Sequence, residues 1–294
     1  MRWKLAMAAL AASWGLISVL AAAVDLEAGP LAFLRLALGA LTVACLALAI
    51  GGPASLGPQG RLGALAALGA VHGVHWALFF EAVKRGSVAL ASITFYTAPL
   101  FLALVAPFLL RERVSRVALA ALVPGGVGVA VVALTGSDGG RFSFLAIAAG
   151  LGSAATYALF VVGSKRLLRA RLPPLALTFW DTAFGALAVA PLLLGADRIL
   201  PGSASDWGSV LALGAIFSGL ATLGYVLVLR RVTAQTAGIL TFLEPVSAVV
   251  LAAALLQQTI GLGTIVGGAL VVVAGAIVIA LEPDEADPGA TYRQ

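Results

Sequence analysis

Long apolar runs alternate with short polar connections along the whole chain. A helix that crosses a bilayer needs about 20 mostly apolar residues, and ten runs reach that length. They cover approximately residues 4–23, 31–50, 62–81, 88–110, 115–135, 143–164, 175–196, 207–229, 235–256 and 261–281. The pattern predicts an all-α integral membrane protein with ten transmembrane helices.

The composition agrees with this pattern. The chain of 294 residues is 61% hydrophobic and only 11% charged, and its mean hydropathy is +1.07. A soluble domain is usually about 45–50% apolar and about 25% charged. The polar residues are too few to cover a water-soluble globule, so we expect the lipid bilayer to be the solvent.

The first run permits a second interpretation. Arg2 and Lys4, followed by an apolar stretch and Ala21–Ala23, also fit a cleavable signal peptide. We favour a membrane span because the run is long enough to cross and has a counterpart later in the chain.

Lysine and arginine are distributed unevenly between alternate connections. With ten spans and a cytoplasmic N-terminus, 13 of the 18 basic residues fall in inner segments, 4 fall in outer loops, and Arg35 lies within a span. Basic residues of short loops concentrate on the cytoplasmic side. We therefore expect a multi-pass protein of the cell (inner or plasma) membrane with both termini cytoplasmic. The net charge of +5 is then a topology signal and indicates no nucleic-acid partner.

The residues that usually build catalytic or cofactor sites are scarce. Cys45 is the single cysteine, there are two histidines, and no Cys/His spacing typical of a metal site is present. The glycine-rich runs at 125–128 and 261–275 follow no predicted strand and lack the Lys-Ser/Thr of a phosphate loop. We expect no metal, no cofactor and no enzymatic activity. Small residues let membrane helices approach closely, so these glycines are expected to pack the scaffold or a homodimer interface.

Four segments recur in chain order at nearly constant spacing. The paired segments are Leu5–Ala9 with Leu145–Ala149, Phe33–Val43 with Phe179–Val189, Leu68–Ala70 with Leu213–Ala215, and Pro99 with Pro245. The repeat predicts a first five-helix half at 1–140, a second at 141–282 and a disordered cytoplasmic tail at 283–294. Five spans is an odd number, so the halves would have inverted topology, which is a recurring plan of secondary transporters.

With these features the chain resembles the drug/metabolite transporter superfamily, and within it the EamA-type exporters. The resemblance rests on the two five-helix halves, the short loop Arg111-Glu112-Arg113, Pro99, Glu244-Pro245 and the glycine-rich last helix. It implies export of small metabolites such as amino acids, or of drugs, often coupled to ion or proton gradients. One departure from the family is Gln258. Members of the family often have a glutamate at this position of the second half, equivalent to Glu112 in the first.

Three ionisable residues lie well inside apolar runs: Arg35, Asp181 and Glu244. Each costs about 2.5–3.5 kcal/mol on insertion scales, so each is a functional candidate. Arg35 and Asp181 are repeat equivalents of opposite charge, and we expect them to approach each other near the centre. The alternative is a buried salt bridge that only fixes helix packing.

Two prolines are expected to kink their helices, Pro99 in the first half and Pro245 in the second. Because Glu244 precedes Pro245, its carboxylate and a freed carbonyl would together suit a cation or a proton. The alternative is a structural kink with Glu244 bonded to a neighbouring helix.

His72 and His75 share a broad helix face with Trp76 and Phe79. Either histidine could bind a substrate carboxylate or relay a proton, and His75 is preferred for the substrate site because it lies deeper. The alternative is a neutral histidine that only bonds to a neighbouring helix. Polar-tipped aromatic residues within spans are further substrate-binding candidates, although simple packing is the favoured interpretation of each one taken alone. These candidates are Trp14, Tyr96, Tyr157, Trp180 and Tyr225, with Thr94 beside Tyr96.

The combined features predict a secondary active transporter with alternating access, which exports a small metabolite such as an amino acid. The expected cavity lies between the runs at 62–81, 88–110, 207–229 and 235–256, with those at 4–23 and 143–164 nearby. Protons are the expected coupling ion, through Glu244 or His75. A multidrug or cationic-compound efflux carrier is the main alternative, and a channel or a membrane-embedded enzyme is less favoured.

Overall fold

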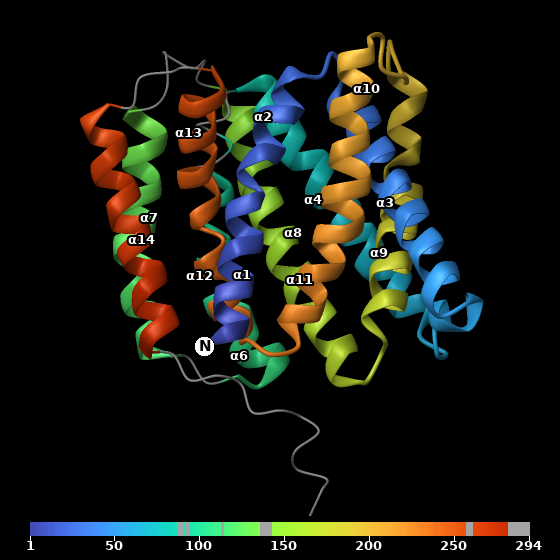
Figure 1. Cartoon of the computed structure of the whole chain (residues 1–294), viewed down its shortest axis with the longest axis horizontal. Helices are drawn as coiled ribbons and strands as arrows, with labels where there is room; N and C mark the ends of the chain where they lie inside the picture. Colours follow the sequence, from blue (N-terminus) through green and yellow to red (C-terminus); the bar gives the residue numbers. More distant parts are fainter. Residues whose placement is uncertain (87–90, 92–93, 113–114, 136–142, 257–260, 282–294) are drawn as a thin grey trace, which may run out of the picture.

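The computed structural model of the chain is a bundle of helices with both described ends on the same side (Figure 1). It describes residues 1–86, 91, 94–112, 115–135, 143–256 and 261–281. Within these residues all regular secondary structure is helical. The predicted boundary at 140/141, the tail at 283–294 and Gln258 lie outside the described residues.

The helices follow the apolar runs of the sequence. In the first half they are α1 (Arg2–Ser13), α2 (Gly15–Ala23), α3 (Ala28–Ile50), the 3-10 helix η1 (Pro53–Leu56), α4 (Leu62–Arg85), α6 (Ala98–Leu110) and α7 (Arg116–Thr135). In the second half they are α8 (Phe144–Arg169), α9 (Pro174–Val189), the 3-10 helix η2 (Ala190–Gly195), α10 (Ala204–Leu211), the π-helix η3 (Ala212–Ala221), α11 (Thr222–Leu229), α12 (Ala234–Leu240), α13 (Leu243–Leu256) and α14 (Leu262–Leu281).

Six helical segments are each long and apolar enough to cross a membrane. They are Arg2–Ala23, Ala28–Ile50, Leu62–Arg85, Phe144–Arg169, Pro174–Gly195 and Ala204–Leu229. Shorter apolar helices cover Ala98–Leu110, Arg116–Val131 and Ile265–Leu281. The structure thus confirms a multi-pass helical architecture, while the ten crossings and the inverted repeat stay predictions.

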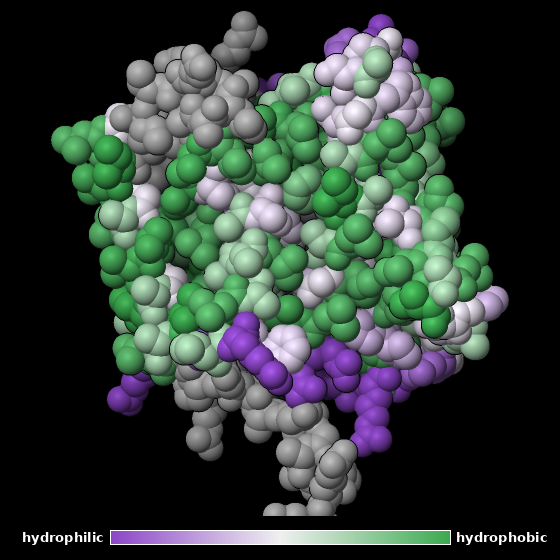
Figure 2. All heavy atoms as spheres, viewed as in Figure 1, coloured by the Kyte–Doolittle hydropathy of each residue, from purple (hydrophilic) through white to green (hydrophobic). Residues whose placement is uncertain are grey.

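The outer surface carries a broad apolar belt. Figure 2 shows hydrophobic residues across the middle of the molecule, with hydrophilic residues gathered along the lower edge, where the N-terminus lies in Figure 1. Large apolar side chains such as Leu104, Phe108 and Leu194 are strongly exposed. Apolar surface of this extent is stable only against lipid, so the belt marks the part of the bundle that contacts acyl chains.

Two spans are interrupted near their middle. Turns at 96–97 and 241–242 precede α6 and α13. Pro99 and Pro245 each lie in the first turn after the interruption, where the missing N–H of proline costs no helix hydrogen bond. The span formed by α10 and α11 contains the π-helix η3, a form that is rare and recurs at functional sites.

Helices α4 and α9 approach so closely that backbone meets backbone. A Cβ atom added to Gly73 would lie 2.4 Å from the carbonyl oxygen of Gly185, and one added to Gly69 would lie 2.7 Å from that of Asp181. The glycine-rich helices α7 and α14 pack together in the same way, since a Cβ on Gly128 would lie 2.5 Å from the Gly267 carbonyl oxygen. The close contacts between these helix pairs therefore depend on small residues where the helices meet.

Gly73→Ala should destabilise the protein because the new methyl group meets backbone atoms that cannot turn aside. We expect a loss of about 1–3 kcal/mol, typical of overpacking, seen as a lower thermal denaturation midpoint in detergent. Gly63→Ala in the same helix is the matched control, since a Cβ there meets nothing within 4 Å. A midpoint for Gly73→Ala equal to that of the control would contradict the packing described.

The two ends of the Ala204–Leu229 span should lie on opposite sides of the membrane. In a Cys45→Ala background, Ser205→Cys and Arg230→Cys place single thiols at exposed positions near either end. The bias of basic residues predicts that a membrane-impermeant maleimide labels Ser205→Cys in intact cells and Arg230→Cys only after permeabilisation. The opposite labelling pattern would overturn the expected orientation.

Candidate functional site

A small cavity lies at the centre of the bundle. Its wall contains nine residues singled out from the sequence, which are Trp14, Arg35, His72, His75, Trp76, Phe79, Tyr157, Tyr225 and Glu244. They come from the α1–α2 junction, α3, α4, α8, α11 and α13. The cavity volume is about 30 Å³, room for one or two water molecules. The sequence candidates therefore converge on one place, which is closed around a space smaller than a metabolite.

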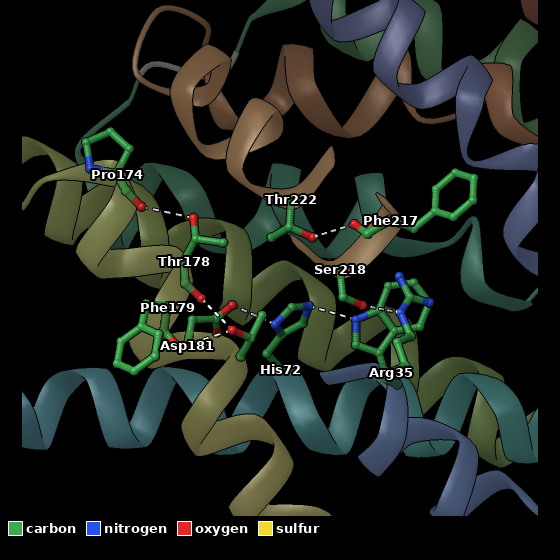
Figure 3. Close-up of polar contacts among 11 residues, drawn as sticks. Arg35, His72, Pro174, Thr178, Phe179, Asp181, Phe217, Ser218 and Thr222 are labelled. Atoms are coloured by element: carbon green, nitrogen blue, oxygen red, sulfur yellow. Dashed lines mark hydrogen bonds and ion pairs between the residues drawn. The ribbon is translucent and has the colours of Figure 1, made fainter. Parts of the chain in front are cut away.

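His72 sits between Asp181 and Trp76. Its Nδ1 lies 2.7 Å from Asp181 Oδ2, and the Trp76 indole N–H donates to its Nε2 at 2.7 Å. Figure 3 shows His72 of α4 directed toward Asp181 of α9. An indole nitrogen can only donate, so Nε2 must accept and the ring proton of His72 lies on Nδ1. His72 is thereby held as a neutral tautomer that donates to Asp181.

Arg35 continues this arrangement from α3. Its Cζ lies 3.4 Å from the centroid of the Trp76 ring, and its Nε–H donates to Ser218 Oγ at 2.6 Å. A guanidinium stacked on an indole gains about 0.5–2 kcal/mol and loses much of its freedom to rotate. Nη1 of Arg35 is buried and has no hydrogen-bond partner among the described residues. The guanidinium is thus held in place, and its Nη1 makes no hydrogen bond to the described residues.

The sequence suggested that Arg35 and Asp181 approach each other, and the structure gives each of them a different partner. The partner of Asp181 is His72, and the partner of Arg35 is Ser218, with Trp76 lying against both His72 and Arg35. The two charges therefore belong to one connected network without forming an ion pair with each other. The intervening aromatic residues come from α4, which separates the repeat equivalents.

Glu244 brings a carboxyl group to the wall of the same cavity. It lies in the first turn of α13, directly after the interruption at 241–242, and is 6% exposed. The Tyr96 hydroxyl and the Arg35 guanidinium are among the groups that surround this carboxyl group. The interrupted helix thus delivers an acidic group to the middle of the bundle.

His75 and two tyrosines form the polar contacts on the side of α8. His75 Nδ1 lies 2.9 Å from Ser153 Oγ and 3.0 Å from the Ser153 carbonyl oxygen. The hydroxyl groups of Tyr157 and Tyr225 are 3.2 Å apart, which joins α8 to α11. Every one of these side chains is buried, so the polar groups of the wall are positioned by the protein and not by solvent.

Three sequence candidates lie outside the cavity wall. Trp180 donates its indole N–H to the Leu56 carbonyl oxygen at 2.7 Å and stacks on Phe184. Thr94 bonds the carbonyl oxygen of Ala91 within its own segment. Tyr96 is buried and packs on Phe95. Trp180, Thr94 and Tyr96 are therefore not among the residues that line the cavity, and their part in substrate binding stays a prediction.

Sequence reasoning missed four lining residues: Phe95, Phe160, Phe217 and Thr222. Phe95 and Phe160 stand beside candidates that were named, yet phenylalanine in an apolar run carries no polar signal. Phe217 and Thr222 belong to the region of η3, where the Thr222 hydroxyl donates to the Phe217 carbonyl oxygen at 3.0 Å. A π-helix shifts the face that a residue presents, and nothing in the local sequence announces it.

Polar and charged side chains also lie at both ends of the bundle, beyond the cavity. Toward the end that holds the N-terminus, the Glu112 carboxylate lies 2.9 Å from Arg169 Nη2 and 3.4 Å from Lys165 Nζ, and it accepts from the Ala234 N–H at 3.2 Å. At the other end a depression of about 840 Å³ is lined by charged residues. They are Asp25, Glu27, Glu81, Lys84, Arg85, Asp197 and Arg198.

Asp181→Ala should destabilise the protein because it leaves the Nδ1–H of His72 buried without an acceptor. We expect a loss of about 1–3 kcal/mol, measured as a lower denaturation midpoint in detergent. Asp181→Asn keeps an acceptor oxygen and should lose less, and Asp206→Ala at a partly exposed position is the control. Equal midpoints for Asp181→Ala and the wild type would rule out the contact as a stabilising one.

The chain is similar in sequence to proteins that are named as transporters. The uncharacterized transporter YxxF of Bacillus subtilis is 27% identical over 203 residues, which cover 66% of this chain and 64% of that protein. The aromatic amino acid exporter YddG of Ancylobacter novellus is 29% identical over 218 residues, 69% of this chain and 73% of that protein. The names of both relatives describe transporters and not enzymes.

A solved crystal structure shares the fold, with a TM-score of 0.77 and 23% identity over 95% of this chain and 96% of the other. The sequence profile of the EamA-like transporter family matches residues 1–134 and 144–281. These two matched segments cover nearly all the helical part of the chain, which therefore belongs to the EamA-like transporter family.

Proposed function

We propose that the protein is a secondary active transporter that exports small metabolites such as amino acids across the inner or plasma membrane by alternating access. The observation that carries this proposal is the central cavity, in which charged, hydroxyl and aromatic side chains from both halves meet inside an apolar bundle. Such groups are costly at membrane depth and mark substrate or ion pathways.

Family membership and symmetry support a carrier. The family profile matches the chain in two successive segments, as expected for two homologous halves. Ten crossings in two inverted five-helix repeats would place the substrate site where the halves meet near the midplane. The interruptions before Pro99 and Pro245 occupy corresponding positions of the two halves, and discontinuous helices of this kind commonly form transporter sites.

The closed cavity is consistent with alternating access. A space of about 30 Å³ admits no metabolite, so a substrate must enter when flanking helices separate. Glu112 contacts Lys165 and Arg169 at the end of the bundle that we propose to be cytoplasmic. Opening toward the cytoplasm would require these contacts to break, which makes them an inner gate.

Multidrug or cationic-compound efflux is the second candidate. Glu244 among Trp14, Tyr157 and Tyr225 is suited to an organic cation, because carboxylate and aromatic faces both attract positive charge. Arg35 in the same wall opposes a simple cation. The mixed charge of the wall therefore favours a metabolite that carries both signs.

The coupling ion is proposed to be the proton. His75 and Glu244 are the titratable candidates, and both line the cavity. If Glu244→Gln and His75→Ala each left the pH dependence of transport unchanged, neither residue would couple protons.

Counterflow in proteoliposomes tests the proposed function. The purified protein is reconstituted with a high internal concentration of one unlabelled solute, and uptake of the labelled solute is followed. We expect saturable counterflow with at least one amino acid and none in protein-free vesicles. Sugars, nucleosides and cationic drugs complete the panel. Conductance without counterflow would indicate a channel, and counterflow only with drugs would favour the efflux alternative.

A further inference from the structure

The cavity wall carries one basic and one acidic side chain that are not paired with each other. Arg35 is 1% exposed and Glu244 is 6% exposed, and both line the cavity. The ion pairs of the described residues include none between these two side chains. Buried opposite charges normally pair directly to offset the cost of leaving water. Two that face one space without pairing leave room for a dipolar ligand between them.

Arg35 has the features of an anion-binding group. Its Nε is used by Ser218, and its plane lies against Trp76, which fixes the orientation of the guanidinium. Nη1 is the buried nitrogen left without a partner. A buried donor without a partner is unfavourable, and a carboxylate is the group whose geometry matches a guanidinium. Nη1 of Arg35 is therefore suited to bind a carboxylate group of the ligand.

Glu244 has the features of a cation-binding group. Its carboxyl group lies beside Tyr96, and its other neighbours on the wall include the aromatic side chains of Trp14 and Tyr225. Trp14 and Tyr225 are themselves in contact, with ring centroids 5.3 Å apart. A primary ammonium is attracted both by a carboxylate and by aromatic faces, so this end of the cavity suits an amino group.

We propose that Arg35 and Glu244 are the two poles of a subsite for a zwitterion, in which Arg35 Nη1 binds the carboxylate and Glu244 binds the ammonium of one amino acid. The subsite rests on the proposed transport function and specifies how that cavity selects its substrate. The aromatic side chains Phe79, Phe95 and Phe160 line the remaining wall and favour an apolar or aromatic remainder. Because the closed cavity is small, binding of the whole ligand accompanies separation of the flanking helices.

Three probes with the same phenyl ring separate the two poles. L-phenylalanine carries both charged groups, 3-phenylpropionate only the carboxylate, and 2-phenylethylamine only the ammonium. Affinities are measured by titration of the purified full chain in detergent. We expect the wild type to bind phenylalanine about 10- to 100-fold more tightly than either single-charge probe, the range of a hydrogen bond to a charged group.

Variants at each pole should change this preference in opposite ways. Arg35→Gln should make phenylalanine and phenylethylamine bind equally, because the carboxylate no longer contributes. Glu244→Gln should make phenylalanine and phenylpropionate bind equally. Arg198→Gln and Glu81→Gln, at sites outside the cavity, are the charge-matched controls and should keep the wild-type preference. Gel filtration monitors folding, and Arg35→Lys, which keeps the charge, provides a milder variant with a smaller but same-direction loss.

Several results would overturn the subsite. They are equal binding of all three probes by the wild type, absence of phenylalanine binding, or a uniform loss of all probes in a monodisperse Arg35 or Glu244 variant. Counterflow is measured on the same preparations. Phenylalanine binding with the expected charge pattern but without counterflow would keep the subsite and reject the proposed transport, whereas counterflow of another solute without the charge pattern would do the reverse.

Discussion

The contact between α4 and α9 determines where the polar groups of the cavity lie. Glycine at positions 69 and 73 lets the two backbones touch, and only at that separation does His72 reach Asp181 at 2.7 Å. The bond to Asp181 fixes the ring of His72, which in turn holds the indole of Trp76. Arg35 then lies on that indole. A single steric constraint between two helices thus propagates through four side chains to the wall of the cavity.

Much of the fold could be predicted from the pattern of apolar residues alone. The run at 31–50 corresponds to α3 (Ala28–Ile50), and the run at 62–81 is extended to Arg85 in α4. The pattern did not predict local departures from regular helix, such as the turn at Trp14 and the π-helix η3. These depend on packing between helices, since a Cβ on Gly39 of α3 would lie 2.7 Å from the Cβ of Ser218 in η3. Helical content is a local property, while such contacts are not.

The candidate site was predictable in part for a related reason. An ionisable residue inside an apolar run is conspicuous, so Arg35, Asp181, His75 and Glu244 could be named without a structure. Their partners could not, because a sequence does not tell which way a helix is rotated about its axis. Ser218 resembled any other small residue of its run, yet it binds the guanidinium of Arg35. No feature of the sequence distinguished phenylalanines such as Phe160 from other apolar residues. Phe160 nevertheless stacks on His72 with ring centroids 4.2 Å apart.

The interruptions at 96–97 and 241–242 also have a mechanical meaning. Hydroxyl groups replace part of the lost backbone bonding there, as Thr97 donates to the Thr94 carbonyl oxygen at 2.7 Å and Thr241 to that of Gly238 at 2.6 Å. The carbonyl groups are thereby satisfied without a continuous helical ladder. Fewer backbone bonds resist bending at these points than along α8, which runs unbroken for 26 residues. We therefore expect the bundle to bend more readily at these two interruptions than along α8. Glu244 lies directly after one of the interruptions.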